Sequence, residues 1–209
     1  PDALIGGAAR LLGEYLGVAC VGFSEADEAG EVFAVTHEWN SGDVSVLGAH
    51  RLDDFGPDMV DRLRAGHVVA FENVADAAET APHLQAFLAQ GFQGFVAAPV
   101  LKGRHLRGTF FVLSRQPRAW SEDEICLVAE VGERVWSALE RQRAIAARLD
   151  SEAQLRLALR AASAGTFKVA PDSEAPPVVS DGARALFGFD PSETPGLEDF
   201  IGRIHPKDR

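Results

Sequence analysis

One long helix is predicted over residues 121–149, SEDEICLVAEVGERVWSALERQRAIAARL, and it limits what the chain can fold into. Ser121 and Glu124 have the spacing of a capping box, in which each side chain accepts a hydrogen bond from the backbone amide of the other residue. After Gly132 no glycine or proline follows until Gly165, so the helix can exceed the usual length of roughly 8–20 residues. A helix of this length usually pairs with another helix.

Small and apolar residues recur along this helix with alternating spacings of three and four, which is a heptad stripe. Its first turns are expected to pack on their own domain. From Glu140 to Arg148 the segment is too polar to lie on a core, which favours an exposed connector or a two-stranded coil, with a break near Asp150 and Ser151. We predict a parallel homodimer through a seam formed by Val131, Val135, Ala138, Gln142, Ile145 and Leu149.

Composition excludes several classes of protein. A length of 209 residues suggests one or two domains, and the net charge of -11 argues against binding to nucleic acids, which reward a basic surface. No apolar run reaches about 18 residues, so no membrane contact is predicted. Cys20 and Cys126 lie in apolar patterns and not in metal-binding spacings, which indicates buried free thiols in a reducing, cytoplasmic compartment. No metal site and no catalytic motif is found.

The first 114 residues alternate helix and strand patterns. The opening helix is expected to place these side chains near one face: Leu4, Ala8, Leu11, Leu12, Tyr15 and Leu16. The elements expected in order are a helix over 3–16, a hairpin of 18–23 and 31–39, a weaker strand over 44–52, a short helix from Pro57, a strand over 68–71, a short helix from Pro82, and a hairpin of 95–101 and 104–114. Both faces of the last strand are apolar, which predicts a central strand covered on both sides.

Five segments of the chain carry a family resemblance. They are LLGEYLGVACVGFSE, the strand end Glu38–Trp39, RLDDFGP, GFVAAPVLKGRHLRGTFFVL and RAWSEDEICLVAEVGERVWSALER. In this order they make residues 1–141 similar to a GAF domain, the small-molecule sensing module of many signalling proteins. The resemblance implies an α+β fold, with an antiparallel sheet flanked by helices and a long exit helix that continues as a helical linker over residues 142–152. A fold does not identify a ligand.

If the domain has a ligand pocket, the short helices and the adjoining strands should line it. The candidate lining residues are Trp39, His50, Arg51, Asp54, Phe55, Phe71, Phe87 and Phe92. The aromatic residues among them are equally suited to a plain core. Arg51 and Asp54 have the charges to orient a polar ligand, although Asp54 is also suited to a turn or cap before Pro57.

No cofactor is assigned from the sequence. Cyclic-nucleotide-binding GAF domains resemble one another in an Asn-Lys…Phe…Asp-Glu signature that this chain lacks. A covalently bound bilin requires a cysteine near the pocket, whereas Cys20 belongs to the first strand and Cys126 to the exit helix. A haem requires a histidine ligand, and isolated histidines such as His37 or His105 are weak indicators of one.

Beyond Asp150 the sequence pattern changes. A second amphipathic helix is expected through Leu155, Leu157 and Leu159, followed by a short strand. Four features carry a second resemblance: Ala164–Phe167, Ser180 before a short helix, Leu186–Phe189 and Ile204–Arg209. Together they make residues 153–209 similar to the N-terminal part of a PAS domain, another sensory module.

We interpret the chain as a GAF–PAS input module of a bacterial signal transduction protein, and expect it to be a piece of a longer protein. A two-component sensor histidine kinase is the preferred parent, with ligand or partner signals passing through the dimeric helix. Two alternatives stay open. One is the input of a cyclic-dinucleotide cyclase or phosphodiesterase, and the other is a dimerisation module without a ligand.

Overall fold

The computed structural model describes residues 2–42, 45–162, 164–168, 177–190 and 192–207. Two compact units, Pro1–Gln142 and Arg143–Arg209, make up the chain, and each is described by itself. Helix α4 (Glu122–Ala161) contributes its first part to one unit and its second part to the other.

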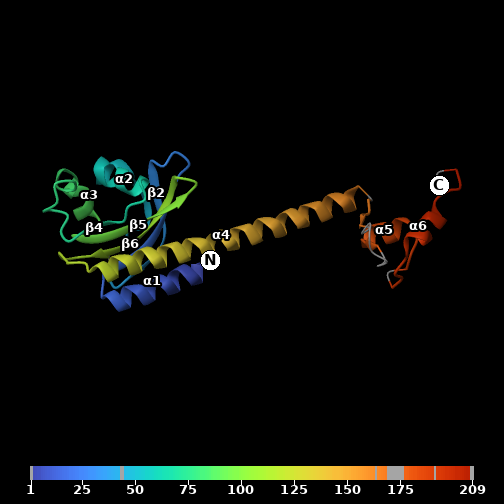
Figure 1. Cartoon of the computed structure of the whole chain (residues 1–209), viewed down its shortest axis with the longest axis horizontal. Coiled ribbons are helices and arrows are strands. Elements are labelled where there is room, and N and C mark those ends of the chain that lie inside the picture. Colours follow the sequence, from blue (N-terminus) through green and yellow to red (C-terminus); the bar gives the residue numbers. More distant parts are fainter. Residues whose placement is uncertain (1, 43–44, 163, 169–176, 191, 208–209) are drawn as a thin grey trace. The chain divides into compact units, whose positions relative to one another are not determined.

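A six-stranded antiparallel sheet forms the centre of the first unit (Figure 1). Its strands stand in the order β3-β2-β1-β6-β5-β4. Their bounds are β1 Cys20–Ala26, β2 Val32–Asn40, β3 Gly48–Arg51, β4 Val69–Phe71, β5 Gly94–Lys102 and β6 His105–Ser114. Strand β6 pairs with β1 on one side and β5 on the other and is buried along most of its length, which confirms the predicted central strand. The α+β class with an antiparallel sheet is likewise confirmed.

Helix α1 (Asp2–Leu16) and the first part of α4 cover one face of this sheet (Figure 1). The buried side chains of α1 are Ile5, Ala9, Leu12 and Leu16. Leu11 and Tyr15 were expected on the same face, but their side chains are 62% and 78% exposed. The expectation is wrong for these two residues because a helix on a sheet buries only a stripe of its surface. The side chain of Leu4 and residue Val44 of the weaker predicted strand lie outside the described parts.

Short helices cover the opposite face of the sheet (Figure 1). They are the 3-10 helix η1 (Leu52–Phe55), α2 (Pro57–Arg64), the 3-10 helix η2 (Ala81–His83) and α3 (Leu84–Ala89). Pro57 stands at the start of α2 as expected, because its fixed φ suits the first helical turn and its missing N–H is not needed there. The side chains of Met59, Val60 and Leu63 are buried, which confirms the inward face predicted for this helix.

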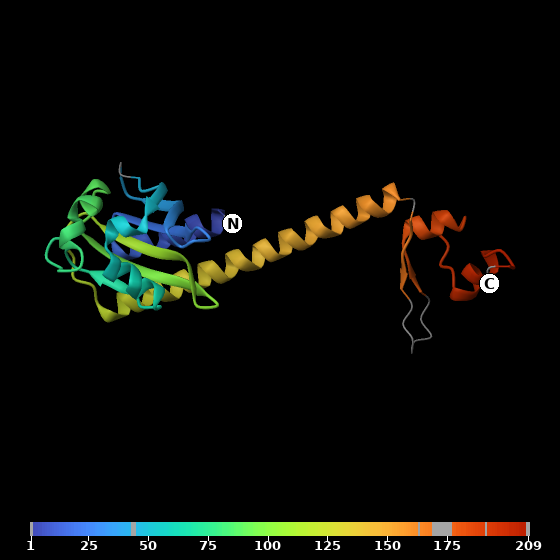
Figure 2. The same ribbon diagram turned by 90° about the horizontal axis from the view of Figure 1, so that it is seen from above.

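Helix α4 begins with the predicted capping box. The amide of Ser121 lies 2.9 Å from Glu124 Oε2, and the amide of Glu124 lies 3.2 Å from Ser121 Oγ. The helix then runs for 40 residues (Figure 2), without the expected break at Asp150 and Ser151. Neither residue prevents a helix, and an Arg148–Glu152 ion pair of 2.8 Å spans the position. Of the helices in the described ranges, none is long and apolar enough to cross a membrane.

The second unit has a small core of its own. After α4 come β7 (Phe167–Lys168), β8 (Val178–Val179), α5 (Asp181–Leu186) and α6 (Leu197–Arg203). The strands β7 and β8 pair as an antiparallel hairpin. Ser180 caps the short helix that was predicted to follow it, since Ser180 Oγ accepts from the amide of Ala183 at 3.3 Å. The buried core side chains are Val179, Ala183, Phe189 and Phe200, while Asp208 and Arg209 of the last predicted motif fall outside the description.

Candidate ligand cavity

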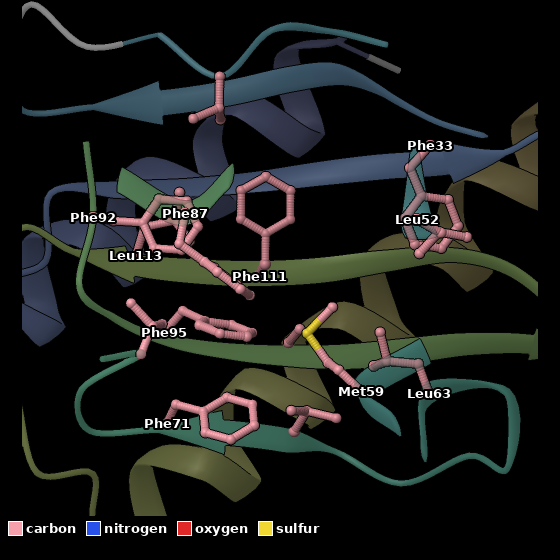
Figure 3. Close-up of a cluster of buried hydrophobic side chains, with 14 of the residues drawn as sticks. Phe33, Leu52, Met59, Leu63, Phe71, Phe87, Phe92, Phe95, Phe111 and Leu113 are labelled. Atoms are coloured by element: carbon pink, nitrogen blue, oxygen red, sulfur yellow. The ribbon is translucent and has the colours of Figure 1, made fainter. Parts of the chain in front are cut away.

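A cavity of about 100 Å³ lies between the sheet and the short helices of the first unit. Strands β1, β2, β3, β5 and β6 supply one part of its wall, and η1, α2 and α3 supply another. The apolar lining side chains are Phe33, Val35, Val46, Leu52, Phe55, Met59, Leu63, Phe87, Phe92, Phe95, Ala97, Phe111 and Leu113. Figure 3 labels many of them, together with Phe71 of the same buried cluster. The cavity is therefore enclosed mainly by hydrocarbon.

Phe87 organises the aromatic part of this wall. Its ring centroid lies 5.2 Å from that of Phe55, 5.8 Å from that of Phe92 and 5.6 Å from that of Phe95. Figure 3 shows Phe87 and Phe92 beside each other, with Phe95 on strand β5. Contacts at these distances contribute about 0.5–1.5 kcal/mol each beyond the burial of the rings. The wall is therefore held in shape by α3 and β5 together.

Four polar side chains also line the cavity, as two pairs. Ser24 Oγ and Thr109 Oγ1 are 2.7 Å apart, so these two hydroxyls share a hydrogen bond across strands β1 and β6, and Ser24 Oγ also lies 3.4 Å from the carbonyl oxygen of Thr109. His50 Nε2 lies 2.8 Å from the carbonyl oxygen of Val46, which makes Nε2 the protonated nitrogen and leaves Nδ1 as an acceptor. Gln90 Nε2 is the donor to His50 Nδ1, at 3.4 Å.

The sequence-based candidates divide between the cavity and other places. The cavity wall includes His50, Phe55, Phe87 and Phe92. Phe71 is buried beside the wall, with its ring 5.3 Å from Phe95, but does not line the cavity. Arg51 and Asp54 are exposed, and Arg51 forms a 3.5 Å ion pair with Asp53. The charged residues expected to orient a ligand are thus at the surface.

Trp39 lies on the opposite face of the sheet, packed against α1. A side chain at Gly13 would meet the Trp39 ring at 2.0 Å, so the ring covers this glycine closely. The cause is a register shift between β1 and β2: Phe23 pairs with His37, whereas Ser24 pairs with Val35. The extra residue, Thr36, reverses the alternation of side chains, because each strand position faces the side opposite to its neighbour. Trp39 therefore faces away from the cavity.

Several cavity residues were missed by sequence reasoning. Ser24, Thr109 and Gln90 are polar residues that no local pattern assigns to a cavity, although Ser24 and Thr109 lie in segments that carry the family resemblance. Phe33 and Phe111 carried a signal, since both lie in alternating apolar strands, but the same signal is given by strand residues on the other face. Only the pairing of strands distant in sequence brings Ser24 and Thr109 together.

The predicted seam residues of α4 occupy different surroundings. Val135 is 4% exposed and belongs to the core beneath the sheet, and Val131 is partly buried against the same core. Ala138 is half-buried and Gln142 is exposed. Ile145 and Leu149 are 54% and 60% exposed. The aliphatic side chains available to a partner therefore lie in the later part of the seam.

Both cysteines are free thiols, in contrasting surroundings. Burial, and secondarily the negative charge of Glu38, raises the pKa of Cys20 to about 12. Cys126 is exposed on α4, although burial was expected for it, and neither cysteine lines the cavity. In the described stretches no three or more His, Cys, Asp or Glu residues gather as they would around a metal ion.

Strand β6 connects the cavity to helix α4. Phe111 lines the cavity, whereas its neighbour Phe110 is fully buried on the other face. There Gly132 of α4 lies so close that an added Cβ would stand 2.7 Å from Phe110 Cβ. One strand position therefore separates the cavity wall from the exit helix.

A second set of contacts ties β4 and α1 to the start of α4. Trp120 Nε1 donates to the carbonyl oxygen of Phe71 at 3.1 Å. Arg118 donates to the carbonyl oxygen of Leu16 at the end of α1 and forms a 2.6 Å ion pair with Glu124. The hydrogen bond from the Ser121 amide, followed by the contact with Arg118, lowers the pKa of Glu124. These contacts fix where α4 leaves the domain.

Comparison with known proteins agrees with this architecture. Among solved structures, the blue-light absorbing form of the Thermosynechococcus elongatus PixJ GAF domain superposes with a TM-score of 0.61 at 20% identity, covering 72% of this chain and 90% of the other. A far-red absorbing dark state with bound biliverdin gives 0.59 at 13% identity, covering 68% and 92%. A domain of a Sinorhizobium meliloti protein described as a two-component sensor histidine kinase gives 0.52 at 18% identity, covering 68% and 92%.

Because these sequence identities are at most 20%, the structural likeness shows a shared fold and not a shared ligand. No curated protein gives a significant match. The family model described as GAF domain matches residues 1–139, which is most of the chain and contains all the described residues of the cavity wall. The chain therefore belongs to the GAF domain family.

Proposed function

We propose that this chain is a sensory input module in which occupancy of the cavity is passed to helix α4. The observation that carries the proposal is the placement of Phe111 and Phe110 on one strand, the first in the cavity wall and the second against Gly132 of α4. Protein interiors are closely packed, so a ligand that displaces Phe111 also moves the neighbouring contact. A binding event then changes the position or rotation of α4.

The proposal includes a parallel homodimer through the later part of α4. Ile145 and Leu149 are large aliphatic side chains exposed on a stretch of α4 that otherwise holds charged residues, Gln142 and alanines. Burying them against a second copy would remove this apolar surface from water and give the helix a partner to move against. The domain limits that we propose are 1–141 for the GAF domain, 142–152 for the linker and 153–209 for the PAS-like part.

The proposed output is a histidine kinase, and the proposed location is the cytoplasm. The structural likeness to a domain of the Sinorhizobium meliloti protein supports such a parent, although it rests on the fold. Reducing conditions in the cytoplasm would keep Cys20 and Cys126 as the thiols seen here.

A bilin chromophore, such as the biliverdin in one of the solved structures, does not fit this cavity. The volume of about 100 Å³ is below the roughly 300–1,000 Å³ typical of pockets for drug-sized ligands. Its described wall contains no cysteine for covalent attachment and no charged side chain to pair with propionate groups. We therefore propose that the sensed molecule is not a tetrapyrrole.

A module that dimerises without a ligand is the second candidate. The small size of the cavity favours it, because the rings of Phe87, Phe92 and Phe95 already fill much of the space between the sheet and α3.

A native mass spectrum of the purified 209-residue chain tests both candidates. A dimer with extra mass is expected from ligand sensing through a paired helix. A dimer of bare chains, both as purified and after incubation with small molecules, would favour the module without a ligand. A monomer at tens of micromolar would contradict the relay through a paired helix.

A further inference from the structure

The size of the cavity limits what it can bind. An apolar protein cavity of roughly 150 Å³ stays dry and binds benzene or xenon, so a cavity of about 100 Å³ limits a ligand to one ring at most. The thirteen apolar side chains of the wall leave little polar surface for a hydrated ligand. A fused nucleotide base with its ribose and phosphate exceeds this space.

The charge of the wall limits the ligand further. In the part of the chain that is described, no Asp, Glu, Lys or Arg lines the cavity. Transfer of an unpaired ion into such a site is strongly unfavourable, since no counter-charge replaces the lost water. Arg51 and Asp53 are occupied with each other at the surface, and Asp54 is also exposed. The wall therefore disfavours an ionised ligand.

The His50 ring offers a hydrogen-bond acceptor in the cavity wall. His50 Nε2 is engaged with the Val46 carbonyl oxygen at 2.8 Å, so Nδ1 is the acceptor of the ring. Its donor, Gln90 Nε2, is at 3.4 Å, beyond the usual range of about 2.7–3.2 Å for a strong N–H hydrogen bond. The hydroxyls of Ser24 and Thr109 share one hydrogen bond of 2.7 Å, and Ser24 Oγ also lies 3.4 Å from the carbonyl oxygen of Thr109, so both hydroxyls are already engaged. A ligand O–H or N–H thus finds its best acceptor at His50.

We propose that the cavity binds a neutral, single-ring organic molecule with one O–H or N–H donor, oriented by His50. This inference rests on the proposed ligand-sensing function and names the ligand class for that site. The apolar body of the molecule packs against Phe111 and Met59, and its donor shares or displaces the weak contact from Gln90.

Phenol and toluene are matched probes for this proposal, because they have similar size and differ in the donor. Met59 is the single methionine of the chain and lines the cavity, so a ¹³C-methyl methionine label gives one NMR signal from the site. Titration of either compound into the full chain is expected to shift this signal to saturation. Absence of a saturable shift with both compounds would overturn the proposal.

Two histidine variants test the orientation by His50. His50→Phe keeps a ring of similar size and removes the acceptor, and should weaken phenol binding about threefold or more while changing toluene binding less than twofold. The matched control His67→Phe alters an exposed histidine outside the cavity and should leave both affinities unchanged. Equal effects of His50→Phe on the two compounds would contradict the assigned donor.

A filling variant tests whether binding takes place inside the cavity. Ala97→Leu places three further carbon atoms in the wall and should abolish both shifts, with folding checked by the amide spectrum. If this variant does not fold, competition in the unaltered protein answers the same question. Toluene is then expected to raise the apparent Kd of phenol, and independent binding of the two compounds would overturn the proposal.

The ligand class and the sensing function fail in different ways. If phenol shifts the Met59 signal but the amide signals of α4 stay in place, the ligand class is supported and the relay is not. If neither probe binds while the native mass spectrum shows another retained molecule, the sensing function is supported and the ligand class is wrong.

Discussion

The two cysteines of this domain show how burial changes the acidity of a side chain. Cys20 and Cys126 have the same side chain, yet the first is 4% exposed inside the core and the second is exposed on α4. Water stabilises a thiolate, so burial favours the neutral thiol and raises the pKa of Cys20 from 9.0 to about 12. The folded chain therefore holds this proton more tightly than the unfolded chain does.

We expect the stability of the domain to fall between pH 9 and pH 12 through Cys20. The unfolded chain ionises first, so the contribution of this group is fully present below pH 9 and decreases by about 1.4 kcal/mol for each pH unit above it. Urea unfolding across this range should show a steeper decline for the unaltered protein than for Cys20→Ala. Cys126→Ala is the control and should follow the unaltered protein. Parallel profiles for all three proteins would contradict the assignment.

Helices α1 and α4 each approach the sheet closely at a glycine, where a larger residue would collide with the neighbouring side chain. Gly132 allows α4 to approach β6 at Phe110, and Gly13 allows the ring of Trp39 to lie on α1. Glycine lowers the stability of a helix by roughly 0.5–1 kcal/mol relative to alanine, so its use at these two positions has a packing reason. The approach at Gly132 is also the contact through which we propose that the cavity acts on α4.

Gly132→Ala is expected to destabilise the domain by about 1–3 kcal/mol, because its Cβ would lie 2.7 Å from Phe110 Cβ and force the helix away. Gly7→Ala makes the same change in α1 with no neighbouring atom within 4 Å, and should stabilise the domain by roughly 0.5–1 kcal/mol. Urea unfolding measures both changes in the free energy of unfolding, which should be a decrease for Gly132→Ala and an increase for Gly7→Ala. Stabilisation by both substitutions would show that the α4 contact tolerates a methyl group.

At the scale of the whole molecule, α4 is the element that both compact units share. Its early residues, such as Val128 and Val135, are fixed in the core of the first unit. From Arg141 to Ala158 every side chain is exposed. A lone helix with this pattern is held by few contacts, which is why we propose that a second copy covers Ile145 and Leu149.

The double variant Ile145→Glu with Leu149→Glu is expected to weaken the dimer by at least about 100-fold. Each buried aliphatic side chain contributes about 1.5–3 kcal/mol, and each chain loses two of them while gaining like charges at the seam. Ala144→Glu with Ala147→Glu adds the same charge at positions off the seam and serves as the control. Sedimentation equilibrium measures both. Equal dimerisation of the two variants would place the interface elsewhere.

The sequence by itself determined the elements and much of their burial. Local signals act within a few residues, so the capping box of Ser121, the start of α2 at Pro57 and the apolar β6 strand were all predictable. The GAF resemblance followed from the order of these elements. Phe87 and Phe92 are expected near a pocket because the short helices of a GAF-like domain lie over the sheet, and both residues line the cavity.

Only the tertiary structure decided which of the strand residues meet in the cavity. The extra residue Thr36 moves Trp39 to the far face, and no local pattern reveals it because a register shift exists only between paired strands. His50 and Arg51 are neighbours, but the pairing of His50 with Phe33 turns the first to the cavity and the second to water. The Ser24–Thr109 contact joins residues 85 positions apart, so it arises from the fold and not from the local sequence.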